Sequence, residues 1–293
     1  MARGKWLVLV AGIVVSGGVA ATVLDSVNTA GSTQSMAFAP MTPPAPGKVP
    51  GRIWEKAARP ADAGWSEEAL NSAWELATSM GSGAILVVHR GVVVASWGNV
   101  SEPYDVFSVR KSLLHALLGP LVESGALDLD ATLAQLNIDD RAGLTATERT
   151  ARVRDLLGSR SGVYLPAAYE TRENAANRPR RGSHGPGEFF YYNNWDFNAL
   201  GTIYERVSKG RIFEDFQQRI AAPLEMEDFS IAHTEYERDR VSEHPAYLFR
   251  MTARDLARFG LLYLRNGRWR DRQIVPANWI DLSVKSYSKE AQP

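Results

Sequence analysis

A serine and a lysine stand three residues apart at the start of an apolar segment, in the run Ser108-Val109-Arg110-Lys111. On a helix this spacing places both side chains on one face. A serine hydroxyl is a weak nucleophile until a base takes its proton. A lysine in a dry site has a lowered pKa, because desolvation disfavours the ammonium form. The pair therefore predicts nucleophilic catalysis by Ser108 with Lys111 as the base, beside helix N–H groups that suit an oxyanion.

The same four residues also have a purely structural interpretation, in which Ser108 caps a helix and Arg110 and Lys111 lie in solvent. The residues that follow favour the catalytic interpretation, because apolar side chains cover most of the helix circumference and such a helix is buried. They are Leu113, Leu114, Leu117, Leu118, Leu121 and Val122. A second copy of the spacing, Ser286 and Lys289, lies in a polar segment with no apolar helix behind it, and we interpret it as chance.

A second candidate group, Tyr192-Asn193-Asn194, follows a run of aromatic residues. A tyrosine near a lysine can transfer protons, and an asparagine side chain can hydrogen-bond a substrate amide and orient the lysine. The structural alternative is an aromatic core cluster followed by an asparagine helix cap. Tyr191 fits the same pattern one residue earlier, so these residues alone leave the register open between Tyr191 and Tyr192.

The composition excludes several classes of function. Of the 293 residues 45% are apolar and 23% are charged, which is typical of a soluble globular protein with a full core. The formal net charge is zero, so we expect no nucleic-acid partner. The sequence has no cysteine, which excludes disulfides and zinc–thiolate sites. Its five histidines lack the spacing of metal ligands, and we expect neither a metal nor another cofactor.

The N-terminal segment is typical of an exported protein. Arg3 and Lys5 precede an uncharged stretch, Trp6–Leu24, so residues 1–25 are expected to be either an export signal or a membrane anchor. Residues 26–50 are rich in proline and are expected to form an extended linker. One folded domain is expected at 51–293, located in the periplasm or anchored to the outer face of the inner membrane.

Hydrophobic periodicity and capping residues predict the elements that position these groups. Helices are expected at 66–80, 108–124, 151–157, 196–208, 212–222 and 252–266, and an antiparallel hairpin at 84–89 and 92–97. Residues 172–187 are expected to be a surface loop, whose Arg178, Arg180 and Arg181 form a basic patch suited to a carboxylate-bearing substrate. A lone hairpin is marginally stable in water. Either further strands lie outside this chain, or strands remain unidentified within it.

Several motifs occur in the order that one family shows. They are Ser108–Lys111, the run from Val153 to Gly162, Tyr192-x-Asn194, Leu200-Gly201 and the run from Met251 to Gly260. Together they resemble the serine β-lactamase and penicillin-binding-protein superfamily, in the branch of class C β-lactamases, related esterases and aminohexanoate-oligomer hydrolases. The step of seven residues from Asn194 to Gly201 resembles the family's step and favours Tyr192 over Tyr191.

The resemblance implies an α/β fold of the α+β type, β-lactamase/transpeptidase-like, in which an antiparallel sheet is flanked by helices and joined to a helical region. It implies Ser108 as nucleophile, Lys111 as base or proton shuttle, Tyr192 as the catalytic tyrosine and Asn194 as a substrate-binding asparagine. The family's third motif, Lys-Thr-Gly or His-x-Gly on a late strand, is not found in the C-terminal part of this sequence. The resemblance therefore implies either that C-terminal strands are missing from this chain or that it is a degenerate member.

These inferences lead to one main hypothesis, a serine hydrolase that cleaves a small-molecule ester or amide, including peptidoglycan-derived compounds, through an acyl-enzyme on Ser108. Two alternatives stay open. One is a non-catalytic envelope binding protein or an inactive fragment of the fold. The other is a DD-peptidase or a β-lactamase.

Overall fold

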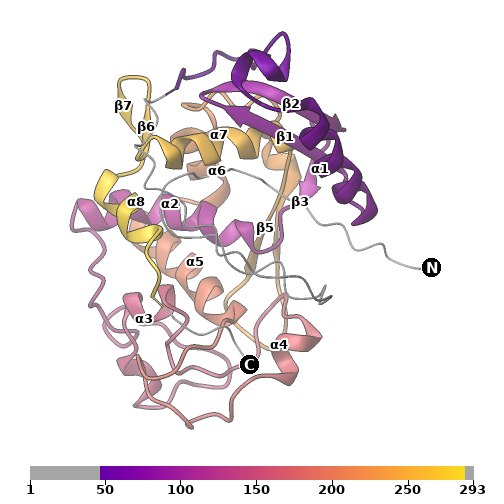
Figure 1. Cartoon of the computed structure of the whole chain (residues 1–293). Coiled ribbons are helices and arrows are strands. Elements are labelled where there is room, and N and C mark those ends of the chain that lie inside the picture. The colour runs from indigo at the N-terminus through magenta and orange to yellow at the C-terminus, as the bar shows by residue number, and fades with distance from the viewer. Residues whose placement is uncertain (1–46, 288–293) are drawn as a thin grey trace.

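The computed structural model describes residues 47–287 (Figure 1). The expected export signal or anchor at 1–25 lies outside these residues. The helices are α1 (Glu67–Ser79), α2 (Val109–Glu123), α3 (Val153–Leu157), α4 (Arg172–Ala176), α5 (Asn194–Ser208), α6 (Ile212–Phe216), α7 (Ala253–Leu264) and α8 (Ala277–Ser283). The strands are β1 (Ala84–His89), β2 (Val92–Gly98), β3 (Tyr104–Asp105), β4 (Thr234–Glu237), β5 (Ala246–Met251), β6 (Arg268–Trp269) and β7 (Arg272–Gln273). Within 47–287 no helix is both long and apolar enough to cross a membrane.

The predicted hairpin is confirmed and lies between two helices. β1 and β2 pair antiparallel, and both turn residues, Arg90 and Gly91, have positive φ, as the tight turns of hairpins require. Ile85 and Val87 point toward α1 and form a small apolar cluster with it. The alternate side chains of β1 face the main core, where α7 packs against this strand (Figure 1). The predicted helix at 66–80 is also confirmed, and its cap Ser66 accepts a hydrogen bond from the N–H of Ala69 at 3.2 Å.

A second antiparallel sheet, in the order β3-β5-β4, contains strands that the sequence analysis did not identify. Its central strand β5 pairs with β3 through Tyr104 and Met251. The N–H of Val106 donates a hydrogen bond to the carbonyl of Phe249 at 3.1 Å just after β3. This pairing fixes the backbone that leads into α2 and so positions Ser108. The expected fold class, antiparallel sheets with flanking helices, is confirmed.

The helices in the centre of the molecule follow the predictions with small differences. α2 crosses the core in contact with α5 and α6 (Figure 1), and most of its side chains are buried. The predicted helix at 212–222 changes at Gln217 from α-helix to a π-helical turn, Gln217–Ala221. The predicted loop at 172–187 begins with a short helix, α4, whose cap Thr171 accepts a hydrogen bond from the N–H of Asn174.

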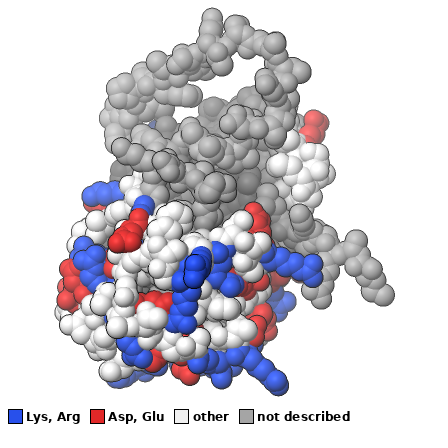
Figure 2. Space-filling model, turned by 90° about the horizontal axis from the view of Figure 1, so that it is seen from below, with Lys and Arg blue, Asp and Glu red and all other residues white. Residues whose placement is uncertain are grey.

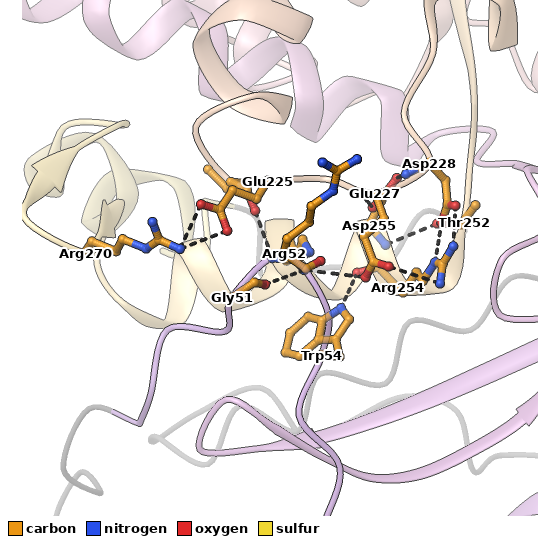
Figure 3. Close-up of polar contacts among 12 residues, drawn as sticks. Gly51, Arg52, Trp54, Glu225, Glu227, Asp228, Thr252, Arg254, Asp255 and Arg270 are labelled. Atoms are coloured by element: carbon orange, nitrogen blue, oxygen red, sulfur yellow. Dashed lines mark hydrogen bonds and ion pairs between the residues drawn. The ribbon is translucent and has the colours of Figure 1, made fainter.

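The segment before α1 is fastened to α7 by buried polar contacts (Figure 3). The guanidinium of Arg258 is fully buried and donates hydrogen bonds to the carbonyls of Gly51 at 2.8 Å and Arg52 at 2.6 Å. The indole N–H of Trp54 donates to the carbonyl of Arg254 at 3.2 Å. These contacts join parts of the chain about 200 residues apart. They hold the segment before α1 against α7.

Candidate active site

Ser108 lies at the first turn of α2 with its side chain exposed. It forms no side-chain capping bond, and its Oγ instead accepts a hydrogen bond from Lys111 Nζ at 3.1 Å. The preceding residue, Phe107, has φ of 44°, a left-handed conformation that is uncommon for an aromatic residue. The hydroxyl is therefore accessible from solvent and in direct contact with the amine one helical turn away.

Lys111 is buried, with 6% of its surface exposed. Besides Ser108, its Nζ donates to the side-chain oxygen of Asn194 at 2.8 Å. Burial, and secondarily the positive charge of Arg110, lower the pKa of Lys111 from 10.5 to about 7. An amine with this pKa is partly unprotonated at neutral pH and can accept a proton from a hydroxyl. The solvent-exposed Arg110 and Lys111 of the structural interpretation are not found, since both side chains are buried.

The two consecutive asparagines at the start of α5 have different hydrogen-bond partners and different roles. Asn193 is the helix cap, and its side-chain oxygen accepts a hydrogen bond from the N–H of Asp196 at 2.8 Å. Asn194 turns its oxygen to Lys111 and donates its amide N–H to the carbonyl of Tyr169. Because the Tyr169 carbonyl can only accept, this bond fixes the Asn194 amide with its oxygen toward the lysine.

The two neighbouring tyrosines have different surroundings. Tyr191 is buried, and its hydroxyl donates to the carbonyl of Asn174 at 2.6 Å. The ring of Tyr192 lies beside the lysine, with its centroid 4.8 Å from Lys111 Nζ. Phe197 contributes a second ring whose centroid is 5.3 Å from the same nitrogen. The structure thus brings Ser108, Lys111, Asn194 and Tyr192 together, and it places Tyr191 in another contact.

Sequence reasoning missed Arg110 and Asn198 as parts of this site. Arg110 is 1% exposed, and its Nη2 donates to the side-chain oxygen of Asn198 at 3.0 Å. Asn198 follows Asn194 by four residues on α5, so the two side chains lie on one face of the helix. A pair of asparagines at this spacing, facing a pair of cations, is the signal that could have identified them.

The basic patch predicted in the loop after Tyr169 is largely neutralised within the chain. Arg178 forms an ion pair with Glu170, and Arg181 forms one with Glu148 at 2.6 Å. Figure 2 shows the face of the molecule seen from below, where acidic and basic side chains lie next to one another. Two of the three arginines are thus already paired with carboxylates, which weakens the expectation that the patch binds a carboxylate-bearing substrate.

A hydroxyl–amine pair at the start of a buried helix, with antiparallel sheets and a second helix around it, is the arrangement of a β-lactamase-type serine hydrolase fold. The sequence model of the family described as Beta-lactamase matches residues 66–286. The chain belongs to this family.

Individual relatives are distant. The chain is 23% identical over 185 residues to Protein flp of Staphylococcus aureus (strain MW2), a match that covers 56% of this chain and 36% of that protein. A penicillin-binding protein homologue from Pyrococcus abyssi, described as octameric, has a TM-score of 0.57 and 21% identity, covering 77% of this chain and 61% of that one. A class C β-lactamase solved with cefoxitin has a TM-score of 0.51 and 13% identity, covering 76% and 69%.

A candidate 6-aminohexanoate-dimer hydrolase from Bacillus anthracis is similar to the same degree, with a TM-score of 0.53 and 23% identity, covering 71% of this chain and 60% of that one. At these identities the solved structures establish the shared fold. The chain spans about a third of the length of the curated relative and about three fifths of the first two solved structures.

Proposed function

We propose that this protein is a serine hydrolase that cleaves a small-molecule ester or amide through an acyl-enzyme on Ser108. The observation that carries the proposal is the hydrogen bond of 3.1 Å between Lys111 Nζ and the exposed Ser108 Oγ. A buried amine with a pKa of about 7 next to an accessible hydroxyl is the pairing that serine activation requires. Family membership supports hydrolysis as the reaction class.

In the proposed reaction Lys111 Nζ takes the proton of Ser108 while Oγ attacks the carbonyl carbon of the substrate. The tetrahedral intermediate collapses, the bond to the leaving alcohol or amine breaks, and that group receives the proton. Tyr192, beside the lysine, is proposed to take part in this proton transfer. Water then attacks the acyl ester, releases the acid and returns the proton to Ser108.

The oxyanion of the intermediate needs donors near Ser108. Within residues 47–287, no backbone hydrogen bond engages the N–H of Ser108. This group, at the positive end of α2, is proposed as one donor. Asn194 is proposed to bind the substrate and to orient Lys111 through the hydrogen bond of 2.8 Å.

A fluorophosphonate probe tests the proposal, because it reacts covalently with activated serines. We expect labelling of the wild-type chain, loss of labelling in Ser108→Ala, and full labelling in Ser112→Ala. Ser112 is the matched control, an exposed serine on the same helix. Absence of labelling in the wild-type protein, or labelling that survives in Ser108→Ala, contradicts the proposal. The lifetime of any adduct with penicillin then separates an esterase or amidase from a DD-peptidase or β-lactamase.

A further inference from the structure

The most unusual charge near the site belongs to Arg110, the residue before Lys111. Its side chain is 1% exposed, and its guanidinium carbon lies 4.5 Å from the centroid of the Tyr247 ring. Within residues 47–287 it forms no ion pair with a carboxylate, and its Nη1 has no hydrogen-bond partner. Buried charges are normally paired with an opposite charge. A cation kept in the core without one calls for a functional reason.

The two neighbouring cations of α2 are held by a matched pair of amides on α5. Asn194 accepts from Lys111 at 2.8 Å, and Asn198 accepts from Arg110 at 3.0 Å. Each asparagine also donates its amide N–H to a backbone carbonyl of residues 168–169. Both amides are therefore fixed with their oxygens toward the cations. Neutral oxygens accept these hydrogen bonds without supplying the negative charge that would stabilise the protonated lysine.

The titratable groups around the two cations come from several elements. Arg110 interacts electrostatically with Tyr169, from the loop before α4, and with Tyr247 of β5. Tyr192 lies beside Lys111. Burial raises the pKa values of Tyr169 and Tyr247, so both phenols are uncharged at neutral pH. Three acids act electrostatically on the Tyr169 phenol, namely Asp105 of β3 and Glu235 and Glu237 of β4.

We propose that Arg110, held by Asn198, is a positioning residue that keeps Lys111 in the neutral form able to accept the proton of Ser108. This inference rests on the proposed function. Two positive charges on adjacent residues in a poorly solvated site repel each other, and arginine does not lose its proton in proteins. The lysine therefore gives up its proton more readily. Burial is the larger cause of its low pKa, and the charge of Arg110 adds to it in the same direction.

Two variants alter this repulsion in different ways. Arg110→Met removes the positive charge, and Asn198→Asp retains Arg110 but places a carboxylate against it. Both are expected to raise the pKa of Lys111 by on the order of one unit. The pKa is measured directly by NMR of the full chain with ¹⁵N-labelled lysine. The pH dependence of fluorophosphonate labelling is measured in parallel. Its acidic limb is expected to move to higher pH, with labelling at pH 6 about tenfold slower.

Arg206→Gln is the matched control. Arg206 is an exposed arginine on the same helix as Asn198, and about 18 Å along the helix axis from Asn194. The Arg206→Gln variant is expected to leave the pKa of Lys111 and the pH profile of labelling unchanged. A folded Arg110→Met or Asn198→Asp protein with an unchanged lysine pKa overturns the inference. Slower labelling at every pH, with no shift of the acidic limb of the profile, also overturns the inference, because a purely structural role of Arg110 would give that result. If the wild-type protein is not labelled at any pH, the proposed function fails, and the NMR titration still decides the role of Arg110.

Discussion

Replacing Lys111 with methionine is expected to change the stability of the protein in a way that depends on pH. The pKa of this amine falls from 10.5 to about 7 on folding, so the unfolded chain binds the proton more tightly than the folded one. The contribution of this lysine to the stability of the wild-type protein therefore rises with pH between about 7 and about 10.5. The contribution changes by ~1.4 kcal/mol per pH unit and by on the order of 5 kcal/mol over the whole range. Methionine has no such dependence.

The expected sign at pH 7 follows from two opposing costs. Keeping a lysine of pKa about 7 in the folded state costs on the order of 4 kcal/mol at this pH. The methionine variant leaves the buried oxygen of Asn194 without its donor, which costs about 1–3 kcal/mol. We therefore expect Lys111→Met to be more stable than the wild type by roughly 1–3 kcal/mol at pH 7. This advantage should shrink with increasing pH and vanish or reverse near pH 9.5.

Urea unfolding of both proteins at a series of pH values from 6 to 9.5 measures this difference. Groups common to both chains cancel in the comparison. Lys285→Met is the control, because Lys285 is exposed in the folded state and its surroundings change little on unfolding. A difference between Lys111→Met and the wild type that stays constant from pH 7 to 9.5 would refute the claim that the folded protein holds this lysine with a lowered pKa.

Three further substitutions probe other parts of the structure by urea unfolding. Arg258→Met removes the buried donors that hold Gly51 and is expected to lower the free energy of unfolding by at least about 3 kcal/mol. An unchanged midpoint of urea unfolding would show that this contact is unimportant. Burial raises the pKa of Asp196 to about 7, so the contribution of this carboxyl group to stability falls as pH rises from about 4 to 7. The free energy of unfolding of Asp196→Asn relative to the wild type should therefore increase over this range, by on the order of 4 kcal/mol in total. A difference between the two proteins that stays constant from pH 4 to 7 would contradict this. In Gly119→Ala the new methyl group would lie 2.5 Å from the Trp279 side chain. The free energy of unfolding is expected to fall by about 1–3 kcal/mol. An unchanged free energy of unfolding would mean that the Trp279 ring moves aside.

Local signals in the sequence were sufficient for the first hairpin and for six of the helices, but they did not reveal the short helices α4 and α8. Ser66 and Thr252 both cap helices at the expected positions, with hydrogen bonds to N–H groups three residues later. The runs 84–89 and 92–97 form the expected strands, and the second extends by one residue. These elements depend on neighbours that are close in sequence, so capping residues, periodicity and turn residues define them.

The strands of the second sheet depend on contacts between distant parts of the chain. β4 has the sequence Thr-Glu-Tyr-Glu and buries none of its residues, so it lacks an apolar signal. β5 is a short, mainly apolar run whose pattern is compatible with several structures. Its partner β3 has two residues and lies about 145 positions earlier in the chain. Pairing across that distance is specified by the packed core as a whole, and the sequence pattern does not reveal it.

The residues of the candidate site divide in the same way. The Ser108–Lys111 contact lies within one helical turn, and the sequence predicts it because the spacing alone brings the two side chains together. The Lys111–Asn194 contact spans 83 positions, and the residues alone offered it as one of two interpretations, which the family resemblance then favoured. The burial of Arg110 has no local signal, since an arginine followed by a lysine is usually a solvated pair. Its acceptor Asn198 is 88 positions away.

Chemistry and stability place opposite demands on the first turn of α2. A core designed for stability would replace Arg110 and Lys111 with apolar residues, or would provide carboxylates for them. Carboxylates would stabilise the ammonium form and so remove the base that Ser108 needs. Two amide oxygens from α5 accept one hydrogen bond from each cation and leave the charge of the lysine unfavourable. The stability that the fold gives up at this turn thus corresponds to the free energy that lowers the pKa of the lysine, so that part of it is neutral at pH 7 and can take a proton from a hydroxyl.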